Sequence, residues 1–207
     1  MRGPVPPKPY HHGDLRRAIL DAGEAELSEK GVIGFSLRHV ATRVGVSHTA
    51  PAHHFGDTAG LLDALAERGF LRLIDCMQAR QDRTVEAPYE QLIATGQGYL
   101  DFALSNSAMF RLLFGSREPP KDGSDLQAAA LGAFLHLAKA VGAVRGCNPM
   151  QHPQERILVL ACWTRAHGLA DLILSGYIDL PDGEQERDAF FRQMLEADVT
   201  PAGMAHP

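Results

Sequence analysis

The chain has 207 residues and a formal net charge of −5, with 45% apolar and 22% charged residues. These values are ordinary for a globular protein of one large or two small domains, and they exclude a disordered chain. No apolar stretch approaches the roughly 20 residues that a transmembrane helix needs. The N-terminus also lacks the apolar region of a signal peptide. We therefore expect a cytoplasmic protein that does not enter a membrane.

The charge is unevenly distributed along the chain. Residues 1–56 carry seven Lys/Arg, five Asp/Glu and six of the ten histidines, whereas residues 57–207 carry 13 Lys/Arg and 20 Asp/Glu. A basic head on an acidic body is typical of a molecule that touches a polyanion at one end. Cys76, Cys147 and Cys162 are widely spaced, so we expect buried thiols, with a redox-sensing thiol as the alternative, and no disulfide framework.

The proline-rich residues 1–13 are predicted to form a flexible arm. A helix is expected to follow, capped by Asp14 and ended by Gly31, because apolar residues then recur at helical spacing. Those residues are Leu15, Ile19, Ala22 and Leu27.

Two short helices and a brief turn are predicted next. Ser36 is a candidate N-cap for the first, which Gly45 ends, and Ser47 is a candidate N-cap for the second, which runs to about Phe55. Pro51 would then sit in the fourth position and distort the first turn. Because the connection is so short, the two helices have to cross steeply, which is the helix-turn-helix arrangement.

Everything beyond this point is predicted to be helical, because turn residues separate long stretches with helical periodicity. The expected helices are 58–83, 88–105, 107–115, 124–145, 153–176 and 184–196. The fold class is therefore all-α, with a helix-turn-helix domain at 14–57 and a helical domain at 58–200. The segment 156–176 is apolar nearly all the way round, so it is either central or completed by a second subunit.

The second short helix has the chemistry needed to read DNA, which requires short polar side chains at the leading end of a narrow element. Flanking donors on the preceding helix would contact phosphates on either side. The predicted DNA-binding residues are Ser36, Arg38, Arg43, Ser47, His48, Thr49, His53 and His54.

Residues 14–65 resemble the DNA-binding domain of the tetracycline-repressor family. The resemblance rests on F-S-L-R-H-V-A-T-R-V-G-V-S at Phe35–Ser47, on H-H-F at His53–Phe55, and on the leucine-rich helix that follows. It implies operator DNA contacts at Arg38 and at positions 47–49 and 53–54. At the position of Ala52 the family usually has Tyr, and at the position of Thr58 it often has Lys. Both departures weaken the contact with the DNA backbone that the resemblance implies. His54, Arg43 or the arm residues Arg2 and Lys8 could supply these phosphate contacts.

A second, looser resemblance lies in A-C-W-T-R-A-H-G at Ala161–Gly168, which looks like the Trp…His-Gly signature of one branch of these regulators. The family fold implies a homodimer through the helices at about 153–176 and 184–196. It also implies a small-molecule effector site among the middle helices, in a ligand-binding and dimerisation domain. The candidate ligand-binding residues are Phe102, Met109, Phe110, Trp163 and His167.

These features together predict a repressor that leaves its operator DNA when a small-molecule effector binds to it. The rival hypotheses are a helical metal-dependent enzyme that uses the N-terminal histidines, and a helical protein-interaction module. His53 and His54 are adjacent and diverge by about 100° on a helix, so they do not suit one metal ion. No catalytic or nucleotide-binding motif occurs, so the sequence predicts no catalytic residue, no metal site and no cofactor.

Overall fold

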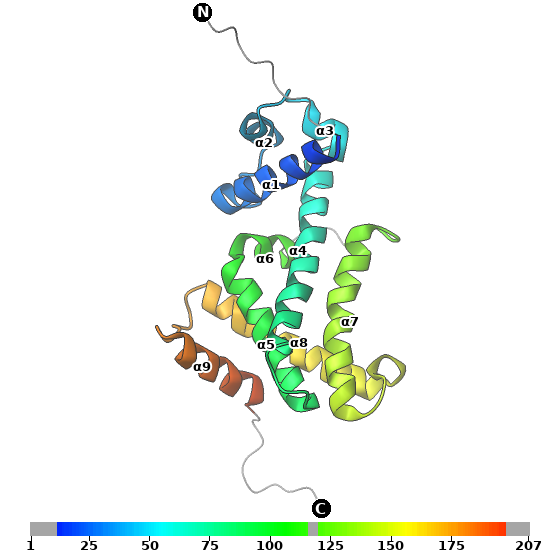
Figure 1. Ribbon diagram of the computed structural model, residues 1–207, viewed down its shortest axis with the longest axis vertical. Coiled ribbons are helices and arrows are strands. Elements are labelled where there is room, and N and C mark those ends of the chain that lie inside the picture. The colour runs from blue at the N-terminus through cyan, green and yellow to red at the C-terminus, as the bar shows by residue number, and fades with distance from the viewer. Residues whose placement is uncertain (1–11, 116–119, 198–207) are drawn as a thin grey trace, which may run out of the picture. The chain divides into compact units, whose positions relative to one another are not determined.

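The computed structural model describes residues 12–115 and 120–197, and Figure 1 shows its helices. The secondary structure of this part of the chain is helical, with no β-strand. Its elements are α1 (His12–Lys30), α2 (Leu37–Val44), α3 (Ala50–Phe55), α4 (Thr58–Gln81), α5 (Pro88–Ser105), α6 (Ser107–Phe114), α7 (Asp125–Arg145), the short 3₁₀ helix η1 (Pro149–Gln151), α8 (Pro153–Leu174) and α9 (Glu184–Glu196). The all-α prediction is confirmed.

Contacts between residues divide the chain into two compact units. Of the described residues, the first unit contains those up to Gly69 and those within 108–126, and the second contains Phe70–Ser107 and those from Gln127 onward. The division therefore falls inside α4, whereas the sequence suggested a boundary at 57/58, which stays a prediction. The predicted arm at 1–13 lies almost wholly outside the described residues.

The first unit has a small apolar core beneath α2 and α3. Ile19 and Leu27 on α1 are fully buried with Val40 on α2 and with Leu61 and Leu65 on α4. The recurrence of apolar residues at helical spacing places one face of each helix against the others. On the surface, Arg68 donates to Asp21 at 2.7 Å, and the guanidinium of Arg16 lies 4.9 Å from the centre of the Phe55 ring.

The second unit is built around α5, which packs against both α8 and α9. Leu100 and Phe102 on α5 are fully buried. The chain approaches itself closely here, because a Cβ on Gly98 would lie 2.5 Å from the backbone oxygen of Cys76 on α4. Only glycine allows α5 to lie this near α4.

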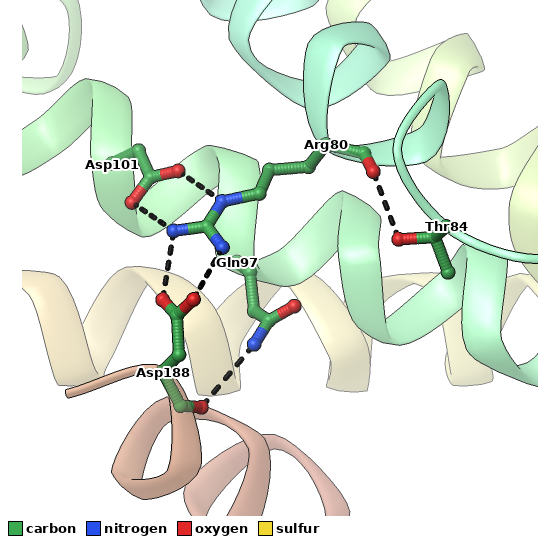
Figure 2. A network of polar contacts seen from close by, with 5 residues as sticks. All are labelled: Arg80, Thr84, Gln97, Asp101 and Asp188. Carbon is green, nitrogen blue, oxygen red and sulfur yellow. Dashed lines mark hydrogen bonds and ion pairs between the residues drawn. The ribbon is translucent and has the colours of Figure 1, made fainter. Parts of the chain in front are cut away.

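An arginine between two carboxylates joins three helices of this unit. Arg80, near the end of α4, donates to Asp101 on α5 and to Asp188 on α9, the latter through two bonds of 2.8 Å, as Figure 2 shows. Gln97 adds a bond to the backbone oxygen of Asp188 at 3.2 Å. The hydrogen bonds that Arg80 donates to Asp101 and, with a smaller effect, to Asp188 raise the pKa of Arg80 above its ordinary value.

Two predicted helix starts were wrong. α1 begins at His12, so Asp14 lies in its first turn and does not cap it. α3 begins at Ala50 with Thr49 as its N-cap, so Ser47 belongs to the turn and Pro51 lies in the first helical turn. Proline is well tolerated there, because the first N–H groups of a helix have no partner within it. Pro51 therefore helps to start the helix and does not distort it.

Two helices are long and apolar enough to cross a membrane by length and composition: α7, with 33% of its most apolar window buried, and α8, with 22%. The expectation that no segment approaches this length was therefore wrong. Core helices of globular proteins meet the same criterion, so the finding is weak evidence for a membrane span.

Candidate functional site

The turn between α2 and α3 depends on Gly45. This residue ends α2 with φ 75° and ψ 32°, in the left-handed region that side chains with a Cβ rarely adopt. The last carbonyl groups of α2 find donors within the turn, since Ala41 O accepts from Val46 N at 3.1 Å. The prediction that Gly45 ends this helix is confirmed.

The polar side chains of α3 and of the turn before it form an exposed group. Ser47, His48, Thr49 and His53 are all exposed, and the hydroxyl groups of Ser47 and Thr49 lie 3.1 Å apart. The apolar side of the same segment points inward, since Pro51 is fully buried. A short helix with one buried face thus presents its other face, with donors and acceptors, to solvent.

The remaining predicted DNA-binding residues divide into accessible and engaged ones. Arg38 on α2 is exposed. Ser36 is half-buried and is the N-cap of α2, although its side chain makes no capping hydrogen bond. His54 is half-buried, with its ring 6.3 Å from that of Phe55.

Arg43 is exposed at the surface and bonds two carboxylates of α1. Its Nε donates to Glu26 at 3.1 Å, and its terminal nitrogen donates to Glu29. Glu26 is 1% exposed and also bonds the Nδ1 of His39 at 2.9 Å. Burial by itself would raise the pKa of Glu26, but the hydrogen bonds from His39 and Arg43 outweigh it and lower that pKa below its ordinary value.

The sequence reasoning missed Glu26. A usable signal was present, because Glu26 follows Ile19 by seven residues and so lies on the apolar stripe of α1. A charged residue on such a stripe needs a partner, and the basic residues of α2 were the available ones.

A polar cluster in the second unit contains two of the candidate ligand-binding residues. The hydroxyl of Tyr99 on α5 lies 2.8 Å from Nδ1 of His167 on α8, and the indole nitrogen of Trp163 donates to the same hydroxyl at 3.4 Å. Burial raises the pKa of Tyr99, so the phenol keeps its proton. Burial also lowers the pKa of His167, although the negative charge of Asp171 acts in the opposite direction and raises it.

The structure does not bring all the candidate ligand-binding residues together within one unit. Phe102 is fully buried in the second unit, which also contains Trp163 and His167. Met109 and Phe110 belong to the first unit, where Met109 packs against Gly69 and Phe110 lies 5.1 Å from the ring of Phe114.

Within residues 12–115 and 120–197, no group of three His, Cys, Asp or Glu side chains could hold a metal ion. The three cysteines are free thiols that are partly buried. Burial raises the pKa of Cys76 and of Cys162, which makes these two thiols less reactive.

Comparisons with known proteins agree on one family. Residues 19–65 match the bacterial regulatory proteins of the tetR family, and residues 92–197 match the tetracyclin repressor-like C-terminal domain. The Trp…His-Gly branch within that family stays a prediction. The comparisons give no support to the enzyme alternative, since the curated relatives are HTH-type transcriptional regulators.

Individual relatives are similar at moderate identity. The HTH-type transcriptional regulator Rv1816 of Mycobacterium tuberculosis is 28% identical over 138 residues, which is 64% of this chain and 58% of the relative, so the match spans under two thirds of that regulator. A protein of unknown function from Rhodococcus sp. RHA1 is 31% identical, with a TM-score of 0.74 over 91% of this chain and 97% of its own. A TetR-like transcriptional regulator from the same organism, 15% identical, shares the fold with a TM-score of 0.61 over 90% of this chain and 96% of its own.

Proposed function

Because this chain belongs to the tetR family of bacterial regulatory proteins, we propose that it is a homodimeric transcriptional repressor that binds operator DNA and is released by a small-molecule effector. The proposal places it in the cytoplasm, where such DNA is found. The observation that carries it is the exposed polar group on α3 and the turn before it, which lies over the buried Pro51 and is flanked by the exposed Arg38 on α2. Such a group offers contacts to base edges and phosphates together.

We propose different roles for the predicted DNA-binding residues, and the contacts of Arg43 bear on its role. Base edges are read by Thr49 and His53 with Ser47 and His48, and phosphates are contacted by Arg38. Arg43 orients α2 through Glu26 and Glu29, so its effect on DNA binding is expected to be indirect. Ser36 and His54 are half-buried and contribute at the edges of the interface.

The test is a mobility-shift titration with DNA from the promoter region that precedes the gene. His53→Ala should weaken binding to the specific site by about 1–3 kcal/mol and relax its sequence preference, whereas Arg38→Ala should weaken binding to all sequences and reduce the salt dependence. His152→Ala, which removes an exposed histidine at the start of α8, is the matched control and should bind as the wild type does. Wild-type affinity in both test variants would contradict the proposed interface.

Two features of the second unit support the effector part of the proposal. Tyr99, Trp163 and His167 place polar atoms among buried side chains, and Phe134 adds an aromatic ring 6.0 Å from Trp163. Effector sites are commonly apolar with a few converging polar groups. An aromatic or acyl ligand with one hydrogen-bonding end fits this chemistry, and a thermal-shift screen of such compounds tests it.

A further inference from the structure

His39 connects the buried acid of α1 with the exposed surface of α2. Its Nδ1 lies 2.9 Å from one carboxylate oxygen of Glu26, and the other oxygen of that carboxylate accepts from Nε of Arg43. Glu26 is 1% exposed, whereas 60% of the His39 side chain is exposed. Within residues 12–115 and 120–197, Glu26 is the only hydrogen-bond partner of the His39 ring. One ring nitrogen is therefore engaged inside the protein, while most of the side chain is open to solvent.

The buried carboxylate decides which nitrogen of His39 carries the proton when the ring is neutral. An ionised carboxylate only accepts hydrogen bonds, and the lowered pKa of Glu26 keeps it ionised near neutral pH. Nδ1 therefore has to be the donor, because a bare nitrogen would otherwise face a carboxylate oxygen across 2.9 Å. A neutral imidazole has one proton for its two nitrogens, so Nε2 is then an acceptor. Only the protonated ring offers an N–H group at Nε2.

The charge around His39 changes from negative to neutral when its ring is protonated. Two carboxylates of α1, Glu26 and Glu29, face α2, and Arg43 bonds both of them. Two acids against one guanidinium leave this cluster with a formal charge of −1, which a proton on His39 cancels. The titratable side chains of α3 and of the turn before it are His48, His53 and His54. Within the described residues none of these three bonds His39, so the charge on its ring depends on the acids of α1.

His39 also lies beside the proposed phosphate contact of α2. Arg38 is its neighbour in the first turn of this helix, and both side chains are exposed. Ser36, the N-cap of α2, precedes His39 by three residues and so lies on the same side of the helix. A phosphate held by Arg38 is therefore near His39. A protonated ring would donate to such an anion, whereas the neutral ring would present a lone pair to it.

We propose that His39 is a phosphate contact of the DNA interface that forms only when its ring is protonated, and that Glu26 imposes this condition by holding Nδ1. The inference rests on the proposed function and adds a residue to its interface. DNA binding then takes up one proton at His39 in each subunit. Because the bound state holds the extra proton, affinity is highest at low pH and falls as the pH rises from about 5 to 8, where imidazoles lose their protons.

The first experiment measures DNA affinity and proton uptake together. Full-length protein is titrated into a duplex from the promoter region that precedes the gene, from about pH 5.5 to 8.5, and the heat of binding is compared in two buffers of different ionisation enthalpy. Each proton taken up changes the affinity by up to about tenfold per pH unit. His39→Asn keeps an N–H donor for Glu26 but has no titratable group. It should take up about one proton fewer per subunit than the wild type and have a similar affinity at the alkaline end.

Two comparisons isolate His39 from the other histidines. Those of α3 and of the turn before it titrate in the wild type and in His39→Asn alike, so their contribution cancels in the difference between the two proteins. His152→Asn is the matched control, because it removes an exposed histidine at the start of α8. It should keep the proton uptake and the pH dependence of the wild type.

The second experiment distinguishes the proposed chemistry from a role in folding. His39→Lys carries its charge throughout this pH range, so it should bind DNA several-fold more tightly than the wild type at the alkaline end, with a flatter pH dependence. Glu26→Gln lifts the condition on the ring, because an amide can donate to Nδ1 and leave the proton on Nε2. This variant should take up fewer protons and keep its affinity at high pH. A purely structural role of Glu26 would instead weaken binding by the same factor at every pH.

The outcomes separate this inference from the proposed function. A wild-type chain that binds neither the promoter duplex nor a duplex of random sequence at any pH would overturn both. A wild type that binds DNA, with the same proton uptake in His39→Asn, would overturn only the contact of His39. If His39→Asn fails to fold, His39→Lys decides, and an affinity that falls with pH as steeply as in the wild type would overturn the contact. Reduced uptake in His39→Asn and Glu26→Gln, with tight alkaline binding by His39→Lys, would support it.

Discussion

Glu26 is a buried acid that binds two side chains of the neighbouring helix α2. Its carboxylate is buried, and both His39 and Arg43 of α2 bond it. The sequence predicted that Arg43 would contact a phosphate, and that role stays a prediction. In the structure Arg43 also pairs with the buried acid, since an unpaired carboxylate in that position would be costly.

Glu26→Gln is expected to lower the free energy of unfolding by about 1.5–3 kcal/mol at pH 7, because charged hydrogen bonds become neutral ones. The folded pKa of Glu26 is lowered, so its stabilisation is complete above the ordinary pKa of about 4.3 and is lost as the pH falls through the folded value. Urea denaturation of both proteins between pH 7 and pH 3 should show the difference shrinking at the acidic end. Glu29→Gln removes the exposed partner of Arg43 and should cost less; equal losses would contradict the role of burial.

The hydroxyl of Tyr99 is shared by two partners. Trp163 can only donate, so the phenol oxygen accepts from it, and the same hydroxyl lies within hydrogen-bond distance of Nδ1 of His167. Tyr99→Phe should destabilise the protein by about 0.5–1.5 kcal/mol. Tyr89→Phe, at a position 47% exposed, is the control and should leave thermal unfolding unchanged. A loss of similar size at both positions would show that the hydroxyl of Tyr99 has no special role.

At the scale of helices, periodicity and turn residues predicted nearly all the elements. The limits of α5, α8 and α9 agree with the sequence-based ranges to within a few residues, because Pro88, Pro153 and Gly183 mark their starts. The start of α3 was predicted wrongly, because a proline such as Pro51 can either interrupt a helix or lie in its first turn, and the sequence pattern does not distinguish the two. Contacts between helices, such as Glu26 with α2, depend on packing that a single helix pattern does not contain.

Arg80 is expected to fasten α9 to the rest of its unit, because its planar fork meets Asp101 and Asp188 together. Arg80→Lys keeps the charge but loses the paired bonds, and we expect a loss of about 1–2 kcal/mol after allowance for the partial exposure of both carboxylates. The substitution should increase the rate of backbone hydrogen exchange more in α9 than in α8. Arg83→Lys, just beyond α4, is the control; unchanged exchange in the Arg80 variant would show that apolar packing alone holds α9.

At the scale of the whole molecule, binding of effector and of operator should be mutually unfavourable. For any compound found by the thermal-shift screen, affinity for the protein–DNA complex should be lower than for the free protein by the same factor by which the compound weakens DNA binding. Couplings of this kind are typically about 1–3 kcal/mol. Calorimetric titration of the compound into the free protein and into the protein–DNA complex measures both affinities. The same two titrations with His53→Ala, which is expected to bind the operator more weakly, are the control. Equal affinities would contradict release by effector.

The exposed apolar side chains of α8, among them Ile157, Leu160 and Leu172, also bear on the life of each newly made chain. Until a partner arrives, a folded subunit of 22.5 kDa carries an exposed apolar stripe, which is the kind of surface that chaperones and proteases recognise. Pairing is bimolecular, so its half-time lengthens as synthesis slows. A regulator made in few copies would therefore spend longer as a vulnerable single chain than one made in many, and its cellular half-life should rise with its rate of expression.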